Sequence, residues 1–140
     1  MASLDRLESL RGARILVVED DTDTRDALAI LLERCGAVVT AVGSAREALE
    51  VLDDSRPHVL VCDIGLPDED GYALMRKVRA RDPDRGGKVP AAAVTAYTTA
   101  EDRRKALQAG FWEHLPKPLE VRKLLETVAT LRQASVLPGH

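Results

Sequence analysis

Three short, mostly apolar runs stand out along the chain, at residues 14–18, 59–62 and 91–94. Each run is four or five residues long, is apolar at consecutive rather than alternate positions, and is followed directly by a polar residue. Continuous apolarity over so short a run is typical of a strand that is buried on both faces, as in a parallel sheet. Weaker runs at 37–42 and 113–115 predict two further strands.

The segments between these runs carry the pattern of amphipathic helices. Their apolar residues recur three and four positions apart, so that they share one face of a helix. The clearest such faces comprise Leu28, Leu31 and Leu32; Ala45, Ala48, Leu49 and Leu52; and Val121, Leu124, Leu125, Val128 and Leu131. Ser44 and Glu47 have the spacing of a capping box, which predicts a helix start at Ser44. The same spacing between Thr98 and Glu101 predicts another helix start at Thr98.

Strand and helix patterns alternate five times along the sequence. Alternation of this kind predicts a parallel sheet with helices on both faces and right-handed crossovers. A closed eight-stranded barrel needs roughly 200 residues or more, whereas this chain has 140. We therefore expect an open five-stranded sheet in a single domain. We assign residues 14–133 to this domain, 1–13 to an N-terminal linker and 134–140 to a C-terminal tail.

Composition and charge argue against several classes of function, among them nucleic-acid binding and membrane association. The chain is 45% hydrophobic and 31% charged but only 3% aromatic, so its core must be aliphatic. A net charge of −3 provides no basic field to attract nucleic acid or anionic lipid. The apolar runs are too short to cross a membrane, and the charged N-terminal segment does not resemble a signal peptide. The two cysteines, Cys35 and Cys62, form no CxxC motif, so we expect a reduced, cytoplasmic protein without membrane contact.

Polar residues follow the predicted strands directly. In an open parallel sheet, ligands bind beyond the carboxyl ends of the strands, which lie along one edge. The residues at those ends are, in chain order, Glu19, Asp20, Asp21, Asp63, Thr95 and Lys117. Taken alone, each of these residue types is commonly exposed and without a role in chemistry. Their joint position at one edge is what indicates a site.

The chemistry that this set supports follows from charge. Carboxylates packed together repel one another, and a hard divalent cation relieves that repulsion. Mg²⁺ prefers oxygen ligands and retains several waters, which suits two or three carboxylates and a backbone carbonyl; no twelve-residue calcium-binding loop occurs in the sequence. A carboxylate beside such a metal can act as a nucleophile toward phosphorus. Lys117 would stabilise the phosphoryl oxygens, and Thr95 would donate a hydrogen bond to one of them.

Four segments resemble the receiver domains of response regulators in two-component signalling. They are ILVVEDDTDTR (15–25), VLVCDIGLPDEDGY (59–72), AVTAY (93–97) and HLPKP (114–118), and the resemblance spans about residues 14–132. The combination of these motifs in this order is highly specific. The resemblance implies an α/β protein with a flavodoxin-like (βα)5 three-layer sandwich, whose five-stranded parallel sheet has the order 2-1-3-4-5.

The resemblance also implies roles for residues at the first and third strand ends. Asp63 is expected to be the phosphoacceptor. The expected ligands of Mg²⁺, with Mn²⁺ as an alternative, are Glu19, Asp20, Asp63 and the carbonyl of Gly65. A third acid, Asp21, leaves the register of the acidic pair open by one residue, although Glu19 and Asp20 fit the family spacing better. The other interpretation of Asp21 is an acid at a helix N-terminus, where the helix dipole favours it.

At the fourth and fifth strand ends, Thr95 is expected to be the switch hydroxyl and Lys117 to pair with the phosphate. The bond between Lys117 and Pro118 is expected to be cis, an isomer that occurs in proteins almost only before proline. Three residues before the lysine, where the family often carries Tyr or Phe, this chain has His114. An imidazole is smaller than those rings and ionises near neutral pH. We therefore expect Thr95 and His114 to form a switch that differs from the aromatic one.

The function implied is that of a phosphoacceptor receiver in a phosphorelay. It takes a phosphoryl group from the phosphohistidine of a histidine kinase or a histidine phosphotransfer protein, and it switches conformation. Residues 89–118 are similar to receivers fused to hybrid histidine kinases, so we expect the chain to be the C-terminal receiver of such a kinase. Phosphorylation-dependent dimerisation is expected through the face of the fourth and fifth helices.

Three alternatives remain open: a stand-alone single-domain response regulator, a Mg²⁺-dependent phosphohydrolase, and a pseudo-receiver that only binds partners. No nucleotide-binding motif occurs in the sequence, and no helix-turn-helix follows the last predicted helix. Neither kinase activity nor direct nucleic-acid binding is therefore expected of the chain by itself. The catalysis expected of it is confined to its own phosphorylation and dephosphorylation.

Overall fold

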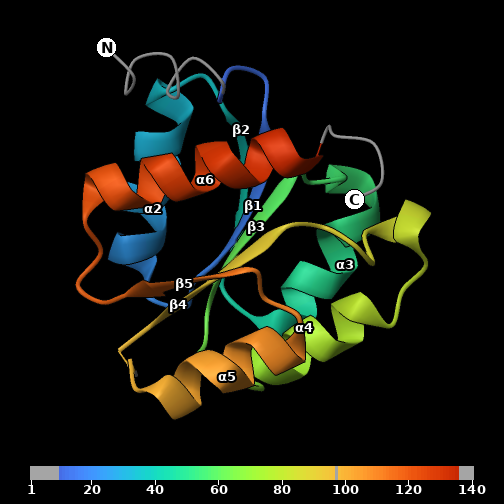
Figure 1. Cartoon of the computed structure of the whole chain (residues 1–140). Helices are drawn as coiled ribbons and strands as arrows, with labels where there is room; N and C mark the ends of the chain where they lie inside the picture. Colours follow the sequence, from blue (N-terminus) through green and yellow to red (C-terminus); the bar gives the residue numbers. More distant parts are fainter. Residues whose placement is uncertain (1–9, 97, 136–140) are drawn as a thin grey trace.

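Strands and helices alternate along the computed structural model, which describes residues 10–96 and 98–135 (Figure 1). The strands are β1 (Arg14–Val18), β2 (Val38–Val42), β3 (Val59–Asp63), β4 (Ala91–Thr95) and β5 (Glu113–Pro116). The helices are α2 (Thr22–Arg34), α3 (Ala45–Ser55), α4 (Gly71–Arg79), α5 (Ala100–Ala109) and α6 (Val121–Ser135), with a short 3-10 helix η1 (Pro83–Arg85) before β4. Most of the predicted linker, most of the predicted tail and Tyr97 of the AVTAY motif lie outside the described residues.

All five strands pair in parallel, in the order β2-β1-β3-β4-β5. This confirms the predicted fold class and the strand order that the resemblance implied. The three strong apolar runs form β1, β3 and β4, and the two weaker runs form the edge strands. Strands β3 and β4 are buried at every position, whereas β2 and β5 keep exposed positions. Because edge strands are only partly covered, their apolar pattern is weaker.

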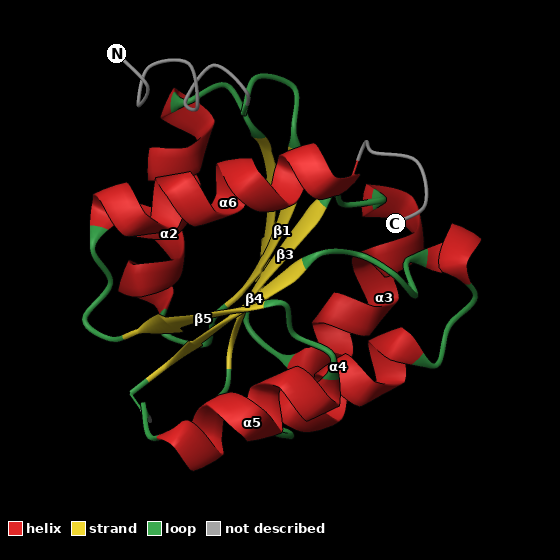
Figure 2. Ribbon diagram, viewed as in Figure 1, coloured by secondary structure: helices red, strands yellow, loops and turns green. Residues whose placement is uncertain are grey.

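The helices cover both faces of the sheet, with α2 and α6 on one face and α3, α4 and α5 on the other (Figure 2). Successive residues of a strand point to opposite faces, so each central strand contributes to two separate cores. In β3, Leu60 and Cys62 pack with the core of α3, α4 and α5, and Val59 and Val61 pack with the core of α2 and α6. The uninterrupted apolar pattern of the central strands is therefore the consequence of a three-layer arrangement.

One of the two predicted helix starts is confirmed. Ser44 is the N-cap of α3, and its hydroxyl accepts a hydrogen bond from the N–H of the third helical residue. The predicted start of α5 was wrong by one residue, because the N-cap is Thr99 rather than Thr98. Thr99 and Asp102 form the reciprocal capping box. Each of the two threonines precedes an acid by three residues, Glu101 or Asp102, so the spacing allows both starts.

The packed region reaches beyond the residues that the strand and helix pattern marks. Leu10 and Ala13 are fully buried against the core of α2 and α6, and α6 continues to Ser135. Two isolated apolar residues carry no periodic signal, so the pattern does not reveal their burial. The limits 14 and 133 for the domain stay a prediction. Among the described residues, no helix is both long and apolar enough to cross a membrane.

Candidate functional site

The carboxyl edge of the sheet carries buried polar side chains. Glu19 follows β1 directly, Asp63 ends β3 and Thr95 ends β4, with exposed fractions of 4%, 6% and 2%. Within residues 10–96 and 98–135, these three are the buried polar or charged residues. Because a charged side chain is rarely buried without a partner or a role, this edge is the candidate functional site.

The parallel register brings the strand ends together. Thr95 pairs with Pro116 of β5, and the carbonyl of Thr95 accepts a hydrogen bond from the N–H of Lys117 at 2.9 Å. The side chain of Lys117 then reaches past β4, and its Nζ lies 2.9 Å from Oδ2 of Asp63. The peptide bond between Lys117 and Pro118 is cis, as the resemblance implied.

Glu19, Asp20 and Asp63 form the acidic cluster. Each offers a carboxylate oxygen, and these oxygens all lie within 4.8 Å of one another. Glu19 and Asp63 are buried while Asp20 is exposed, so the cluster is open to water on one side. Three hard oxygen donors with an open side fit Mg²⁺, which keeps several water ligands when a protein binds it. The carbonyl of Gly65 as a further ligand stays a prediction.

Asp21 lies outside the acidic cluster and caps α2 instead. Its Oδ2 accepts hydrogen bonds from the hydroxyl of Thr24 at 2.6 Å and from the N–H of Thr24 at 2.9 Å. These bonds, the one from the hydroxyl first, lower the pKa of Asp21. The interpretation of Asp21 as an acid at a helix N-terminus is confirmed, and the two acids that lie beside Asp63 are Glu19 and Asp20.

Burial and close contacts at this edge shift the pKa values of Glu19, Asp63 and Lys117. Burial raises the pKa of Glu19 to about 7, and the hydrogen bond and charge of Asp63 act in the same direction. Burial also acts to raise the pKa of Asp63, but hydrogen bonds with Glu19 and Lys117 outweigh it and hold this pKa below its ordinary value. Burial acts to lower the pKa of Lys117, yet the bond to Asp63 raises it overall. At neutral pH, Asp63 is therefore ionised beside a charged lysine.

Asp63 is held in place on both carboxylate oxygens. Oδ2 accepts from Lys117, and Oδ1 accepts from the N–H of Gly65 at 3.1 Å. Helix α4 starts against the same strand end, and this needs a glycine at position 71. A Cβ at Gly71 would lie 2.8 Å from the carbonyl oxygen of Asp63 and 2.9 Å from Cα of Ile64. Nothing in the sequence pattern distinguishes Gly71 from an ordinary loop glycine, so its supporting role was missed.

Arg25 is a second supporting residue that the sequence pattern does not reveal. Its Nη1 donates to the carbonyl of Glu19 at 3.1 Å. The guanidinium lies against Gly43, where a Cβ would be 2.7 Å from that nitrogen. The N–H of Glu19 in turn donates to the carbonyl of Val42 at 3.0 Å. The loop that carries the acids is thus held by both α2 and the end of β2. The sequence does not reveal this role, because a solvated arginine on an amphipathic helix would occur at the same kind of position.

Thr95 and His114 lie on the same face of the sheet. His114 pairs with Ala93, and side chains two residues apart in a strand share a face. Ala93 packs with the core of α3, α4 and α5, so Thr95 and His114 face that side. His114 therefore lies on the face of the sheet that α3, α4 and α5 cover.

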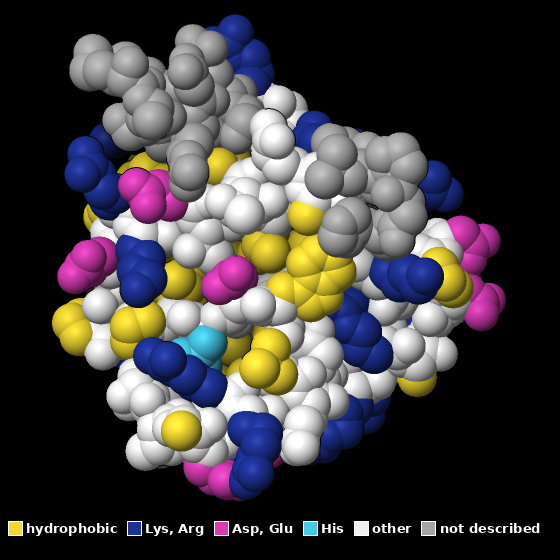
Figure 3. All heavy atoms as spheres, viewed as in Figure 1, with side chains coloured by type: hydrophobic (Ala, Val, Ile, Leu, Met, Phe, Trp, Pro, Cys, Tyr) yellow, Lys and Arg dark blue, Asp and Glu magenta, His cyan; other side chains and the backbone are white. Residues whose placement is uncertain are grey.

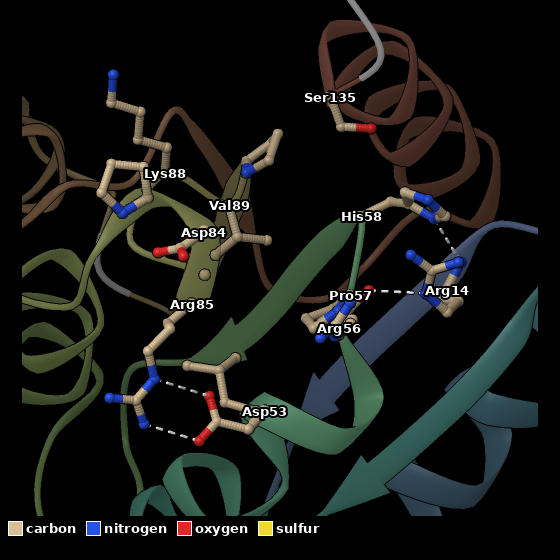
Figure 4. A pocket seen from close by; sticks show the side chains of 14 residues that line it. Arg14, Asp53, Arg56, Pro57, His58, Asp84, Arg85, Lys88, Val89 and Ser135 are labelled. Carbon is tan, nitrogen blue, oxygen red and sulfur yellow. Dashed lines mark hydrogen bonds and ion pairs between the residues drawn. The ribbon is translucent and has the colours of Figure 1, made fainter.

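Two cavities lie at opposite edges of the sheet. A cavity of about 260 Å³ adjoins Glu19, Asp63 and Lys117 and is otherwise lined mostly by apolar side chains. A larger cavity of about 470 Å³ lies where β1, β3 and β4 begin (Figure 4). Two of its charged residues, Asp53 and Arg85, pair with each other, as Figure 4 shows. The larger cavity does not contain the residues singled out by the strand ends, so volume alone does not identify the site.

Comparison with known proteins gives consistent matches over most of the chain. The model of the response regulator receiver domain family matches residues 15–129. A 14.6 kDa protein from the sodA1 3′ region of Leptolyngbya boryana is 43% identical over 122 residues, which cover 87% of this chain and 92% of that protein. The virulence transcriptional regulatory protein PhoP of Salmonella typhimurium is 33% identical over 118 residues, which cover 84% of this chain but only 51% of PhoP.

Among solved structures, response regulators also align with this chain over most of its length. The crystal structure of a CheY-like response regulator receiver domain protein from Methanospirillum hungatei aligns with a TM-score of 0.80 at 30% identity, over 89% of this chain and 96% of that one. The chemotaxis response regulator CheY4 of Vibrio cholerae aligns with the same TM-score at 25% identity, over 86% of this chain and 98% of that one.

Proposed function

This chain belongs to the receiver domain family of response regulators, and from this premise we propose that it accepts a phosphoryl group on Asp63 in a phosphorelay. The donor is the phosphohistidine of a histidine kinase or a histidine phosphotransfer protein. The observation that carries the proposal is the environment of Asp63. It is a buried carboxylate whose pKa is held low, 2.9 Å from a lysine ammonium and within 4.8 Å of two further acids.

The geometry supports nucleophilic attack by Asp63. A carboxylate oxygen of Asp63 forms a bond to phosphorus while the bond from phosphorus to the donor nitrogen breaks, and the imidazole leaves. Because the pKa of Asp63 is below its ordinary value, the nucleophile is ionised at neutral pH. The N–H of Gly65 and the ammonium of Lys117 orient its two oxygens, and Lys117 is close enough to stabilise charge on the transferred group.

The acidic cluster supports a divalent cation as the cofactor. Glu19, Asp20 and Asp63 would hold Mg²⁺, with Mn²⁺ as an alternative and with the Gly65 carbonyl as a further ligand. When bound, the ion supplies positive charge that offsets both the carboxylates and the phosphoryl oxygens. The exposed carboxylate of Asp20 leaves the approach from solvent open to the donor.

Thr95 and His114 are proposed as the switch. Phosphorylation adds roughly −1.5 to −2 charges and three acceptor oxygens, and the Thr95 hydroxyl donates to one of them. His114, which shares the face of the sheet with Thr95, follows this movement. A signal leaves the site in this way through α5 and β5.

The same region is the proposed dimer face. Helices α5 and α6 each expose a large apolar side chain, Leu107 at 63% and Val121 at 54%. On the face seen in Figure 3, hydrophobic side chains lie between interspersed basic and acidic ones. We propose that phosphorylation promotes pairing of two chains through α5 and α6.

The parent protein is proposed to be a hybrid histidine kinase that carries this chain as its C-terminal receiver in the cytoplasm. The chain spans 51% of PhoP and 26% of the response regulator protein FleR of Pseudomonas aeruginosa, so relatives of this family occur within longer proteins. A stand-alone single-domain regulator is the second candidate. The relative from Leptolyngbya boryana favours it, because this chain covers 92% of that protein.

The test is phosphorylation by acetyl phosphate with Mg²⁺, followed by intact mass. Wild type is expected to gain one phosphoryl group per chain, and Asp63→Asn is expected to gain none while it stays folded, since the amide has nearly the same shape. Asp70→Asn is the matched control, because Asp70 caps α4 in the same loop and asparagine is an equally good cap. Stoichiometric labelling of Asp63→Asn would exclude Asp63 as the acceptor. Rapid turnover of phosphate esters would instead indicate a phosphohydrolase, and no labelling of wild type would indicate a pseudo-receiver.

A further inference from the structure

Asp68, which lies outside the acidic cluster, bonds the loop between β3 and α4 to the start of another helix. Its Oδ1 accepts the N–H of Ala45 at 3.1 Å, and its Oδ2 accepts the N–H of Arg46 at 2.9 Å. Ala45 and Arg46 are the first two residues of α3. The bond to Arg46, together with the bond to Ala45, outweighs the opposing effect of burial and holds the pKa of Asp68 below its ordinary value. The carboxylate is thus ionised and engaged on both oxygens although the residue is exposed.

We propose that Asp68 is a positioning residue for the metal site. By holding the loop of residues 64–70 on the N-terminus of α3, it fixes the carbonyl of Gly65 beside the acidic cluster. The part of this inference that concerns Mg²⁺ rests on the proposed function; the part that concerns the loop does not.

Apart from the N–H of Ile64, which donates to the carbonyl of Val94 on β4 at 3.1 Å, the other bonds of this loop are local. The N–H of Leu66 and the N–H of Gly71 both donate to the carbonyl of Ile64, and Asp70 caps α4 by accepting from Ala73 at 2.8 Å. These contacts shape the loop on its own strand and its own helix. The two bonds of Asp68 connect it to a segment more than twenty residues away in the chain.

The end of β2, which leads into the turn before α3, is bonded to the loop that carries the acids. The carbonyl of Val42, at the end of β2, accepts the N–H of Glu19 at 3.0 Å. Asp68 therefore completes a connection from Glu19 through the turn before α3 to the loop of Gly65, which are the two sides of the proposed metal site.

The bonds of Asp68 are strong for an exposed residue. The first N–H groups of a helix have no partner within the helix, and a carboxylate placed there gains from the helix dipole. Hydrogen bonds to a charged acceptor are also shorter and stronger than neutral ones. Ser44 satisfies the third N–H of the same helix from within its own segment. Ser44 thus caps α3 without connecting it to the loop, and it provides a matched control.

The first test measures backbone hydrogen exchange in the metal-free protein. Asp68→Ala is expected to accelerate exchange at Gly65 and Leu66 by about tenfold or more, the scale of losing one or two charged hydrogen bonds. Ser44→Ala is expected to accelerate exchange at the start of α3 only. Equal exchange at Gly65 in wild type and Asp68→Ala would overturn the proposal.

The second test measures the Mg²⁺ dissociation constant by calorimetry. Asp68→Ala is expected to weaken binding by about tenfold. Asp68→Asn is expected to fall in between, because its amide oxygen still accepts one of the two bonds, and Ser44→Ala is expected to bind as wild type does. Equal weakening in Ser44→Ala would attribute the effect to helix stability and overturn the proposal. If wild type binds no Mg²⁺, the proposed function fails, and the exchange experiment alone decides the role of Asp68.

Discussion

At the carboxyl edge of the sheet, carboxylate oxygens of Glu19, Asp20 and Asp63 lie within 4.8 Å of one another. At the amino edge, by contrast, several charged side chains bond to carbonyls or to opposite charges. Arg79 is the clearest case at the amino edge. Its Nε and Nη2 donate to the carbonyl of Gly110 at 3.0 and 2.6 Å, and its Nη1 donates to the carbonyl of Gly87 at 3.0 Å. These bonds connect the end of α4 to the end of α5 and to the loop before β4.

The amino edge therefore stabilises the fold, whereas the carboxyl edge, which is the candidate functional site, acts against it. Bonds at the amino edge satisfy carbonyls that would otherwise lack partners, so they lower the free energy of the folded state. At the carboxyl edge, the burial of Glu19 beside Asp63 raises that free energy, and the raised pKa of Glu19 reflects this burial first and the bond and charge of Asp63 second. A cluster that disfavours folding is typical of a functional site.

The largest change in the free energy of unfolding is expected at the amino edge, from the substitution Arg79→Met. Methionine fills a similar volume but leaves the carbonyls of Gly87 and Gly110 without their donor, so the free energy of unfolding should fall by about 3 kcal/mol. Chemical denaturation measures this. Arg46→Met is the control, because the side chain of Arg46 is exposed and, among the described residues, pairs with Glu50 alone; this change should cost less than about 1 kcal/mol. If both substitutions lowered the free energy of unfolding equally, the bonds of Arg79 to the two carbonyls would contribute no more than an exposed ion pair.

The second-largest change in the free energy of unfolding is expected at the carboxyl edge, when Mg²⁺ is added. A ligand that binds only the folded state should stabilise wild type by about 2.7 kcal/mol at a free concentration about 100 times its dissociation constant. In Asp20→Asn this gain should largely vanish, while in Asp21→Asn it should persist, because asparagine still caps α2. Thermal unfolding with and without Mg²⁺ measures both. The reverse result, with loss in Asp21→Asn only, would place the ion on the other acid.

The smallest change in the free energy of unfolding is expected from the protonation of His58, at the amino edge, as the pH falls. Its Nδ1 accepts the N–H of Arg14 at 2.9 Å, and burial, followed by the charges of Arg132 and Arg14, lowers its pKa to about 4. Its contribution to stability is therefore complete above the ordinary pKa of 6.5 and is lost as the pH falls toward 4, because the unfolded chain binds the proton first. The loss should be on the order of 1 kcal/mol, since the side chain is partly exposed and solvent screens it.

His58→Asn isolates this effect. The amide oxygen of asparagine can accept the same hydrogen bond but does not titrate. The difference in unfolding free energy between wild type and His58→Asn should therefore change between pH 7 and pH 4.5, with wild type losing more. A difference that is constant across this range would contradict the assignment.

Much of the fold is predictable from the sequence because it depends on periodic patterns. The continuous apolar runs of β1, β3 and β4 and the residues that directly follow them place the main site residues without any structure. What could not be predicted depends on contacts between distant segments. Arg25 bonds across a loop, Asp68 bonds to α3, and Leu10 is buried in the core of α2 and α6. Their residue types occur just as often on exposed surfaces, so no local pattern distinguishes them.

The two cores on either side of the sheet also have a consequence for how sequences of this family can diverge. In β4, Ala93 belongs to the core that contains Phe111, whereas its chain neighbour Ala92 belongs to the core that contains Leu115. We therefore expect a larger side chain at position 93 to be compensated by a smaller one within the core that contains Phe111, and not by a change at position 92. The sheet separates two sets of core positions, and we expect each set to change through its own series of substitutions while the other stays the same.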